Sequence, residues 1–199
     1  MEEKIIYFEV TGRENTEETL RLVAERAKAR GISKIVLAST RGETARSAAE
    51  HFAGTNIKMV VVPHQQGFGE TQRFPMELVS ELERKGHHVH FGTMLFHTDS
   101  FYGINTPSVM ATILRIFCQG MKVCIEIILM ATDGGCIATG EKVIAVTGTG
   151  RGADTAVVAI AAPSTKLSEL HVTEIICKPL ETKSWPAGTR PPAGIVRPG

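Results

Sequence analysis

Short apolar runs rich in valine and isoleucine alternate with longer segments whose apolar positions lie three and four residues apart. Such runs are typical of strands buried on both faces of a parallel sheet, and the spacing is typical of amphipathic helices. Elements that alternate in this way are expected to form right-handed β-α-β units. In the first half of the chain the strands are expected at residues 4–10, 34–38, 57–62 and 88–91, and the helices at 15–31, 45–53 and 75–83.

The second half of the chain begins with a long loop, residues 93–106, and continues with helical and β-rich segments. Gly120 is expected to interrupt the helical part, and a glycine-rich segment is expected to join two strands as an antiparallel hairpin. The helices are expected at 107–117 and 121–130, and the strands at 142–147, 155–161 and 172–177.

These elements predict an α/β protein, a three-layer α/β/α fold with a mostly parallel sheet and a C-terminal antiparallel hairpin. Residues 1–180 are expected to form a single ligand-binding domain, because no internal repeat or second domain stands out. Residues 181–199 are rich in proline and glycine. They are expected to form a tail that is extended or wraps a neighbouring chain.

The loop of residues 39–44, between a buried strand and an alanine-rich helix, is the first candidate binding site. The first turn of a helix has amide groups without intrahelical acceptors and carries the positive end of the helix dipole, so it can bind a phosphate. Gly42 would let the ligand approach the backbone, and Arg41 would add a positive charge. The alternative is a loop that only caps the helix and makes a tight turn. The candidate residues are Ser39, Thr40, Arg41, Gly42, Glu43 and Thr44.

The loop of residues 63–74 follows the next strand and combines polar, aromatic and glycine residues. It leaves the carboxyl edge of the sheet, where ligands bind in folds of this kind. His64 could hydrogen-bond a ligand or act as acid or base, and Phe68 could lie against a flat ring. The alternative is a surface loop anchored by a phenylalanine. The candidates here are His64, Gln65, Gly67 and Phe68, and Asn15 could either cap its own helix or face the same ligand.

Residues 148–154, with the sequence G-T-G-R-G-A-D, contain the letters of a dinucleotide-binding fingerprint, G-x-G-x-x-A. No clear helix follows them, so a hairpin with a glycine-rich tip is predicted instead. Its backbone amides and Arg151 could close over an anion, and the alternative is a flexible hairpin without a binding role. The candidate residues of this segment are Thr147, Gly148, Arg151, Gly152 and Asp154.

Two pairs of polar residues stand out in apolar surroundings. Lys122 and Glu126 are four residues apart on an almost wholly apolar helix, so they share a face. Buried charges are costly unless they pair or bind a ligand; a structural pair is the favoured interpretation, and Lys122 is kept as a candidate ligand contact. His88 and His90 also share a face, as metal ligands would, but no third ligand is evident at metal-site spacing. No metal site is therefore expected.

Composition and charge argue against two classes of partner. The 22 basic and 21 acidic residues give a formal net charge of +1, which is unlike a nucleic-acid binder that depends on phosphate contacts. No long uncharged apolar run approaches the length of a membrane span, and the N-terminus lacks a signal-peptide pattern. We therefore expect a cytoplasmic protein with four reduced cysteines, no nucleic-acid partner and no membrane association.

Several of these motifs together resemble the stand-alone proteins that are similar to the pyruvate kinase C-terminal domain. The most specific match is Val143–Ala156 (V-I-A-V-T-G-T-G-R-G-A-D-T-A). In pyruvate kinase itself, the loop that resembles residues 39–44 is the sugar-phosphate effector site, and the glycine-rich hairpin lies beside it. The resemblance covers about residues 4–180, and its other pieces are Asn15-Thr16, Ile35–Ala45, Pro63–Phe68 and Gln119–Val123.

In the stand-alone proteins the same pocket looks suited to flavin mononucleotide (FMN). The resemblance therefore implies FMN as the cofactor and a flavin-dependent oxidoreductase activity, and a homo-oligomer is also expected. The catalytic barrel of pyruvate kinase has no counterpart in these residues, so phosphotransfer from phosphoenolpyruvate is not expected. The alternatives are a non-enzymatic sensor of a sugar phosphate or other phosphorylated metabolite, and a scaffold with a vestigial pocket. The sequence identifies no catalytic residue, and His64 is the best candidate.

Overall fold

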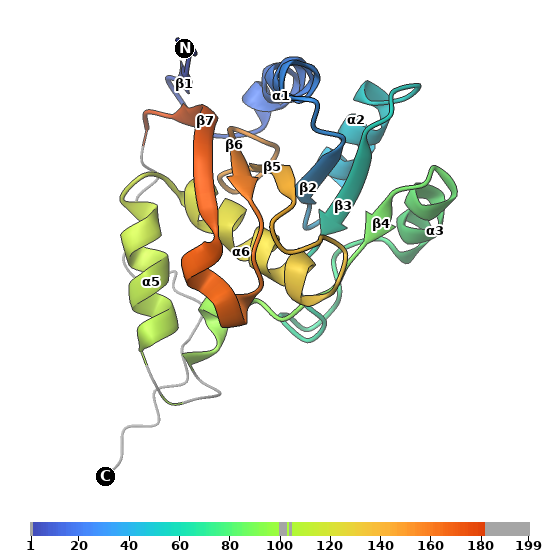
Figure 1. The fold of residues 1–199 in the computed structure, drawn as a ribbon. Helices are drawn as coiled ribbons and strands as arrows, with labels where there is room; N and C mark the ends of the chain where they lie inside the picture. Colours follow the sequence, from blue (N-terminus) through green and yellow to red (C-terminus); the bar gives the residue numbers. More distant parts are fainter. Residues whose placement is uncertain (1, 100–102, 104, 182–199) are drawn as a thin grey trace.

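The structure is a computed structural model, and it describes residues 2–99, 103 and 105–181. The expected C-terminal tail lies outside the described residues, apart from Glu181. The described residues form one sheet of seven strands, in the order β1-β7-β6-β5-β2-β3-β4 (Figure 1). The strands are β1 (Ile6–Phe8), β2 (Lys34–Ala38), β3 (Lys58–Val62), β4 (His88–Val89), β5 (Lys142–Thr147), β6 (Thr155–Ile160) and β7 (His171–Pro179).

Most of the strand pairs are parallel. Strands β2, β3, β4 and β5 run parallel to their neighbours within this group, and β1 runs parallel to β7. Strand β6 runs antiparallel to both β5 and β7, so residues 148–154 form the turn of a hairpin. The predicted α/β fold, with its mostly parallel sheet and C-terminal antiparallel hairpin, is therefore confirmed.

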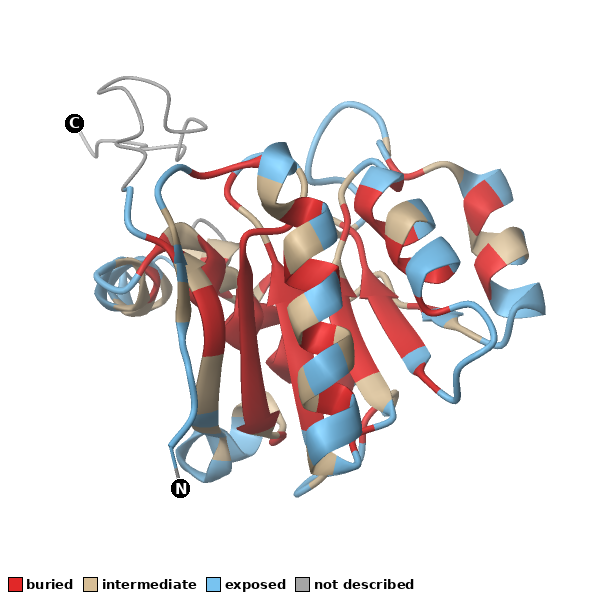
Figure 2. Cartoon of the chain, turned by 90° about the horizontal axis from the view of Figure 1, so that it is seen from above, coloured by how far each residue is buried: buried red, intermediate tan, exposed pale blue. Residues whose placement is uncertain are grey.

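Helices cover both faces of the sheet. Successive residues of the central strands point to opposite faces, so both faces carry apolar side chains that must be covered. In β2, Ile35 and Leu37 belong to the core beneath α1, α2 and α3, whereas Val36 belongs to the core beneath α6. Figure 2 shows this arrangement as buried strands between helices whose outer faces are exposed. The helices are α1 (Thr16–Arg30), α2 (Glu43–His51), α3 (Met76–Arg84), α5 (Thr106–Arg115) and α6 (Gln119–Asp133), and the short 3-10 turns are η1 (Arg13–Asn15), η2 (Leu95–His97) and η3 (Ser164–Glu169).

Two details of the predicted helices are wrong. Asn15 does not cap α1 with its side chain; its carboxamide donates instead to the carbonyl oxygen of Val10, at 2.8 Å. Gly120 does not interrupt the helical segment, because it lies in the first turn of α6. A Cβ atom at Gly120 would lie 2.1 Å from Thr155 Oγ1, so this glycine lets the helix pack closely against β6. Gly31 does end α1, in the left-handed conformation expected of a terminating glycine.

Candidate functional site

The loops that follow β2, β3 and β5 lie side by side at the carboxyl edge of the sheet. Ala38 pairs with Val62, and Leu37 pairs with Val146, so the three strands end at nearly the same level. The N-terminus of α6 lies at the same edge, because Thr147 Oγ1 donates to the carbonyl oxygen of Gly120 at 2.8 Å. The parallel topology thus gathers the loop candidates and two helix N-termini, those of α2 and α6, along one edge.

The 39–44 loop is shaped by packing as well as by its position. Gly42 has a φ of 84°, and a Cβ atom there would lie 2.5 Å from Leu78 Cδ2 and 3.3 Å from Pro75 Cδ. The expected reason for this glycine, close approach of a ligand, is therefore wrong on that side of the residue, because α3 occupies the space. The glycine is required for the turn and for the contact between α2 and α3.

Ser39 and Thr44 are buried in this loop, Thr40 is half-buried, and Arg41 and Glu43 are exposed. Ser39 Oγ accepts a hydrogen bond from the amide of Ala45 at 3.2 Å, so it takes the capping role that the alternative interpretation gave it. The first intrahelical hydrogen bond of α2 runs from Arg46 N to Gly42 O. The amide of Ala45 is taken by Ser39, so the amides of Glu43 and Thr44 are the ones in this first turn that suit an anion.

An aromatic and histidine cluster occupies the next loop along the edge. The rings of His64 and Phe68 meet edge to face with centroids 4.7 Å apart, and those of Phe68 and His97 meet in the same way at 5.3 Å. Phe68 is 37% exposed, so part of its surface stays open to a ligand. Gln65 has a structural role, because its Oε1 accepts from the amide of Met94 at 2.6 Å and joins the two loops.

Lys122 and Glu126 form a buried ion pair beneath this cluster. The two residues are only 1% and 2% exposed, and Lys122 Nζ donates to Glu126 Oε2. Glu126 Oε1 accepts from the amide of Phe96 at 2.9 Å and lies 3.2 Å from His97 Nδ1. The favoured interpretation of this pair as structural is therefore confirmed. It anchors η2 to α6 and so holds His97 against Phe68.

The surroundings change the proton affinities of three of these groups. Burial lowers the pKa of His64, and the charges of Arg73 and His97 lower it further, so His64 is neutral at pH 7. Burial also lowers the pKa of Lys122, against the attraction of Glu126. Burial alone would raise the pKa of Glu126, but its hydrogen bond with His97 and its interaction with Lys122 outweigh burial and lower the pKa to about 2.

Acid should therefore destabilise the protein in part through Glu126. Its folded pKa of about 2 lies below the ordinary value of 4.5, so its contribution is complete above about pH 5 and is lost as the pH falls toward 2. The full loss corresponds to about 3 kcal/mol. We expect urea unfolding to show a steep decrease in stability over this range. The Glu126→Gln variant should be less stable at pH 7 but should lose less stability on acidification. If its stability fell with pH as steeply as that of the parent protein, the acid sensitivity would not come from Glu126.

The glycine-rich hairpin is fastened to the start of α1. Asp154 is fully buried, its Oδ2 accepts from the amides of Gly12 at 3.1 Å and Thr149 at 2.9 Å, and its Oδ1 accepts from Thr155 Oγ1 at 2.8 Å. These bonds give Asp154 a structural role, and its contact with a ligand stays a prediction. The alternative of a flexible hairpin is wrong, because this carboxylate ties the turn to the loop before η1.

Close packing explains the two glycines that flank the hairpin tip, Gly148 and Gly152. A Cβ atom at Gly152, where φ is 72°, would lie 2.4 Å from Thr16 Oγ1, and one at Gly148 would lie 2.2 Å from the carbonyl oxygen of Gly152. Thr16 Oγ1 accepts from the amide of Ala153 at 3.0 Å. Arg151 lies at the exposed tip of the turn.

Thr149 lies in the candidate segment 148–154 but was not singled out from the sequence. It is 6% exposed, and its Oγ1 is the one buried side-chain nitrogen or oxygen atom without a hydrogen-bond partner in the described part of the chain. Buried hydroxyl groups nearly always have partners, so this one needs an explanation. The only signal in the sequence was its place between two glycines of a candidate segment. His97 was also not singled out, and it lies in the long loop expected at residues 93–106.

Apart from Thr44, which is buried in the first turn of α2, the candidate residues fall into two groups. The first group lies at the carboxyl edge of the sheet and is exposed or half-buried, and its members are Thr40, Arg41, Glu43, His64, Gly67, Phe68 and Arg151. The other group supports the edge through internal bonds or packing. Its members are Asn15, Ser39, Gly42, Gln65, Lys122, Thr147, Gly148, Gly152 and Asp154.

A comparison with known protein families agrees with this architecture. Residues 17–159 match the family model described as pyruvate kinase, alpha/beta domain. The match runs from α1 to β6 and includes the 39–44 loop, the 63–74 loop, α6 and the glycine-rich hairpin. Among the described helices, none has both the length and the apolar character needed to cross a membrane. Because the match covers most of the sequence, the chain belongs to the pyruvate kinase alpha/beta domain family.

Proposed function

We propose that this protein binds a phosphate-bearing ligand at the carboxyl edge of the sheet, and that FMN is this ligand. The observation that carries the proposal is the unpartnered hydroxyl of Thr149, which lies in the hairpin at this edge. A buried polar group without a partner costs about 1–3 kcal/mol. A ligand oxygen or nitrogen that hydrogen-bonds to this hydroxyl would offset that cost.

Both ends of an FMN molecule find suitable groups along this edge. The first turn of α2, with the half-buried hydroxyl of Thr40 and the exposed guanidinium of Arg41, suits a phosphate. The partly exposed ring of Phe68, held between His64 and His97, suits a flat aromatic system. These groups support the proposal, and the resemblance to the stand-alone proteins, whose pocket looks suited to FMN, points to the same ligand.

FMN, when bound, would supply oxidation and reduction by hydride or single-electron transfer. The chain's own residues would hold and orient it. His64 is neutral at pH 7, because burial and nearby charges lower its pKa, so it can offer a hydrogen bond to the ring system without adding a charge. The buried ion pair beneath the cluster would keep η2 and its histidine fixed while the ligand enters.

Binding without catalysis is the second candidate function. The buried charged groups nearest the edge, Lys122, Glu126 and Asp154, are all engaged in bonds that hold the fold together. This favours a sensor of a sugar phosphate or a similar phosphorylated metabolite. In that case the ligand would act by stabilising the loops, as any ligand does that binds only the folded state.

The proposal is tested by comparing three ligands with the purified protein. FMN should raise the melting temperature and its fluorescence should change on binding, whereas riboflavin, which lacks the phosphate, should have a much smaller effect. Glucose 6-phosphate serves as a sugar-phosphate probe for the second candidate. A rise in melting temperature with glucose 6-phosphate but not with FMN would support the sensor function. No change with either phosphorylated compound would overturn both.

The Thr149→Val variant should separate ligand binding from stability. Valine has nearly the same shape but lacks the unpartnered hydroxyl, so we expect unchanged or slightly higher stability and roughly tenfold weaker FMN binding, equivalent to about 1.4 kcal/mol. The matched control is Thr173→Val, which removes a hydrogen bond to the carbonyl oxygen of Val158 in β6. The control should lose about 1 kcal/mol of stability and keep its FMN affinity. Equal FMN affinities in Thr149→Val and the parent protein would contradict the role of this hydroxyl.

A further inference from the structure

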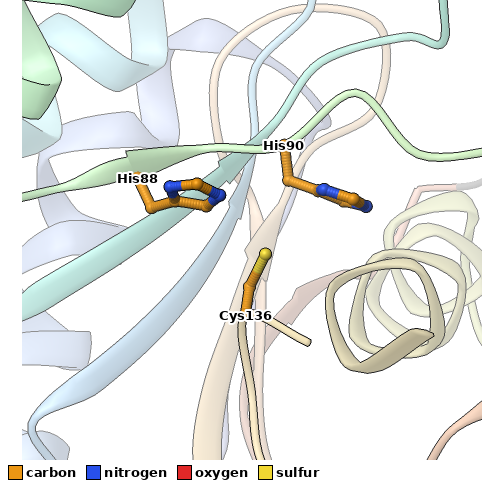
Figure 3. A group of neighbouring side chains, drawn as sticks. All are labelled: His88, His90 and Cys136. Carbon is orange, nitrogen blue, oxygen red and sulfur yellow. The ribbon is translucent and has the colours of Figure 1, made fainter. Parts of the chain in front are cut away.

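Two histidines and a cysteine meet at the edge of the sheet remote from the hairpin. His88 and His90 come from β4 and the residue after it, and Cys136 comes from the loop between α6 and β5. Potential ligand atoms of all three side chains lie within 4.8 Å of one another. Figure 3 shows the Cys136 side chain directed toward the strand that carries the two histidines. The third ligand that the sequence did not reveal is thus supplied by the fold.

The backbone holds both sides of this cluster in place. His88 is paired with Val60 of β3, and the amide of His90 donates to the carbonyl oxygen of Val61 at 2.8 Å. Because residues two apart on a strand share a face, both imidazoles lie on the side of the sheet that α6 covers. The amide of Cys136 donates to the carbonyl oxygen of Ala131 at 2.9 Å, which fixes the loop against the end of α6.

The imidazole of His90 is closely fitted to its surroundings. A Cβ atom at Gly134 would lie 2.2 Å from its Cε1, and one at Gly92 would lie 2.6 Å from its Nε2. Gly134 has a φ of −78°, which any residue adopts, so the space taken by this ring is what requires a glycine there. His90 also forms a hydrogen bond with the backbone of Met130. Hydrogen bonds of this kind orient the ring of a metal-binding histidine.

Negative charge lies beside His90. The carboxyl end of α6 lies beside His90 and carries the negative end of the helix dipole, and the carboxylate of Asp133 acts on the same ring. A positive group, Lys34, is also close, and its Nζ donates to the carbonyl oxygen of Cys136 at 3.4 Å. Its charge is offset by Glu141, at 2.9 Å.

The ligand chemistry indicates which metal would bind. Two imidazole nitrogens and one thiolate sulfur suit Zn²⁺ and Co²⁺, which take tetrahedral nitrogen and sulfur ligands. A tetrahedral zinc site of this composition needs ligand atoms about 3.3–3.6 Å apart, so atoms that now lie within 4.8 Å of one another would move closer by up to about 1.5 Å. His88 is exposed, and His90 and Cys136 are half-buried, so an ion can enter from solvent and a fourth position stays open to water.

We propose that His88, His90 and Cys136 form a binding site for Zn²⁺ or a divalent ion of similar chemistry. The site lies near the carboxyl end of α6, whereas the proposed FMN site lies near its amino end, so the two are independent. The ion would join β4, an edge strand of two residues, to the loop that leads into β5. The site therefore acts as a metal cross-link between an edge strand and a loop distant in sequence.

The test uses Co²⁺ as a spectroscopic probe of the full chain. One Co²⁺ per chain should bind and produce a thiolate-to-metal charge-transfer band, and Zn²⁺ should displace it and raise the melting temperature. Cys136→Ser should abolish the band, and His88→Gln should weaken Zn²⁺ binding at least tenfold. The matched control is His171→Gln, which changes an exposed histidine at the start of β7 and should have no effect.

His88 is exposed, so its replacement should leave the fold intact, and the melting temperature of the metal-free variant checks this directly. Absence of stoichiometric Co²⁺ binding by the parent protein would overturn the proposal. So would a Co²⁺ complex without the charge-transfer band, or one that keeps its spectrum and affinity in Cys136→Ser. FMN binding should be unaffected by either variant, so this result is distinct from the test of the proposed function.

Discussion

Replacing Lys122 with methionine should lower the free energy of unfolding by about 3–5 kcal/mol. Methionine is close to lysine in length and fills the same space, but it leaves the carboxylate of Glu126 buried without its ammonium partner. Breaking a buried pair by removing one charge costs this much, because the remaining charge has lost both water and its counter-ion. Urea unfolding at pH 7, with the parent protein measured in parallel, gives the difference directly.

Two further variants show whether the loss of stability in Lys122→Met comes from leaving a charge buried. The double variant Lys122→Met/Glu126→Gln should recover much of the loss, because the neutral amide oxygen still accepts from the amide of Phe96. Lys85→Met is the exposed control: Lys85 pairs with Glu81 at 2.8 Å on α3, also four residues apart. It should leave stability almost unchanged, because solvent screens this pair. Similar losses from the buried and exposed lysine substitutions would contradict the explanation.

Replacing Asp154 with alanine should cost about 3–4 kcal/mol of stability. The substitution removes the acceptor of three hydrogen bonds inside the protein and leaves the amides of Gly12 and Thr149 without a partner. Hydrogen bonds to a charged group contribute more than neutral ones, and unsatisfied buried donors add a desolvation cost. Chemical denaturation measures the loss, and hydrogen exchange at the amide of Thr149 should become much faster.

The Asp154→Ala substitution should also weaken ligand binding at the proposed site. Because Asp154 holds the turn that carries Thr149, FMN binding should weaken in Asp154→Ala even under conditions where the protein is folded. Asp133→Ala is the control, since Asp133 is exposed and its carboxylate accepts a hydrogen bond from the amide of Ser164. It should have a much smaller effect on stability and none on FMN binding. If Asp154→Ala were as stable as the parent protein, the hydrogen bonds of Asp154 would not be important for stability.

The strands were predictable because the information for them is local. Val36 and its apolar neighbours form a continuous run, and such a run is buried on both faces wherever helices cover a parallel sheet. The hairpin at 148–154 was predictable for a similar reason, since glycines between two β-rich runs leave few other structures. The spacing of Lys122 and Glu126 placed them on one face of a helix before any contact was known.

The roles of individual residues were harder to predict, because each role depends on contacts with residues far away in the sequence. Gly42 is required because Leu78 lies against it, and Gly120 because Thr155 does. Neither partner can be identified from the spacing of residues around the glycine. Cys136 completes the histidine cluster for the same kind of reason, since only the tertiary fold brings its loop to β4.

The N-terminal strand β1 has a consequence for how the chain is made. Its pairing partner in the described sheet is β7, the last of the described strands in chain order, with Ile6 opposite Cys177. β1 is translated before β7, yet the edge on which it docks does not exist until β7 has been made. The sheet therefore closes only after translation of β7, and the nascent chain must keep its first strand from aggregating until then.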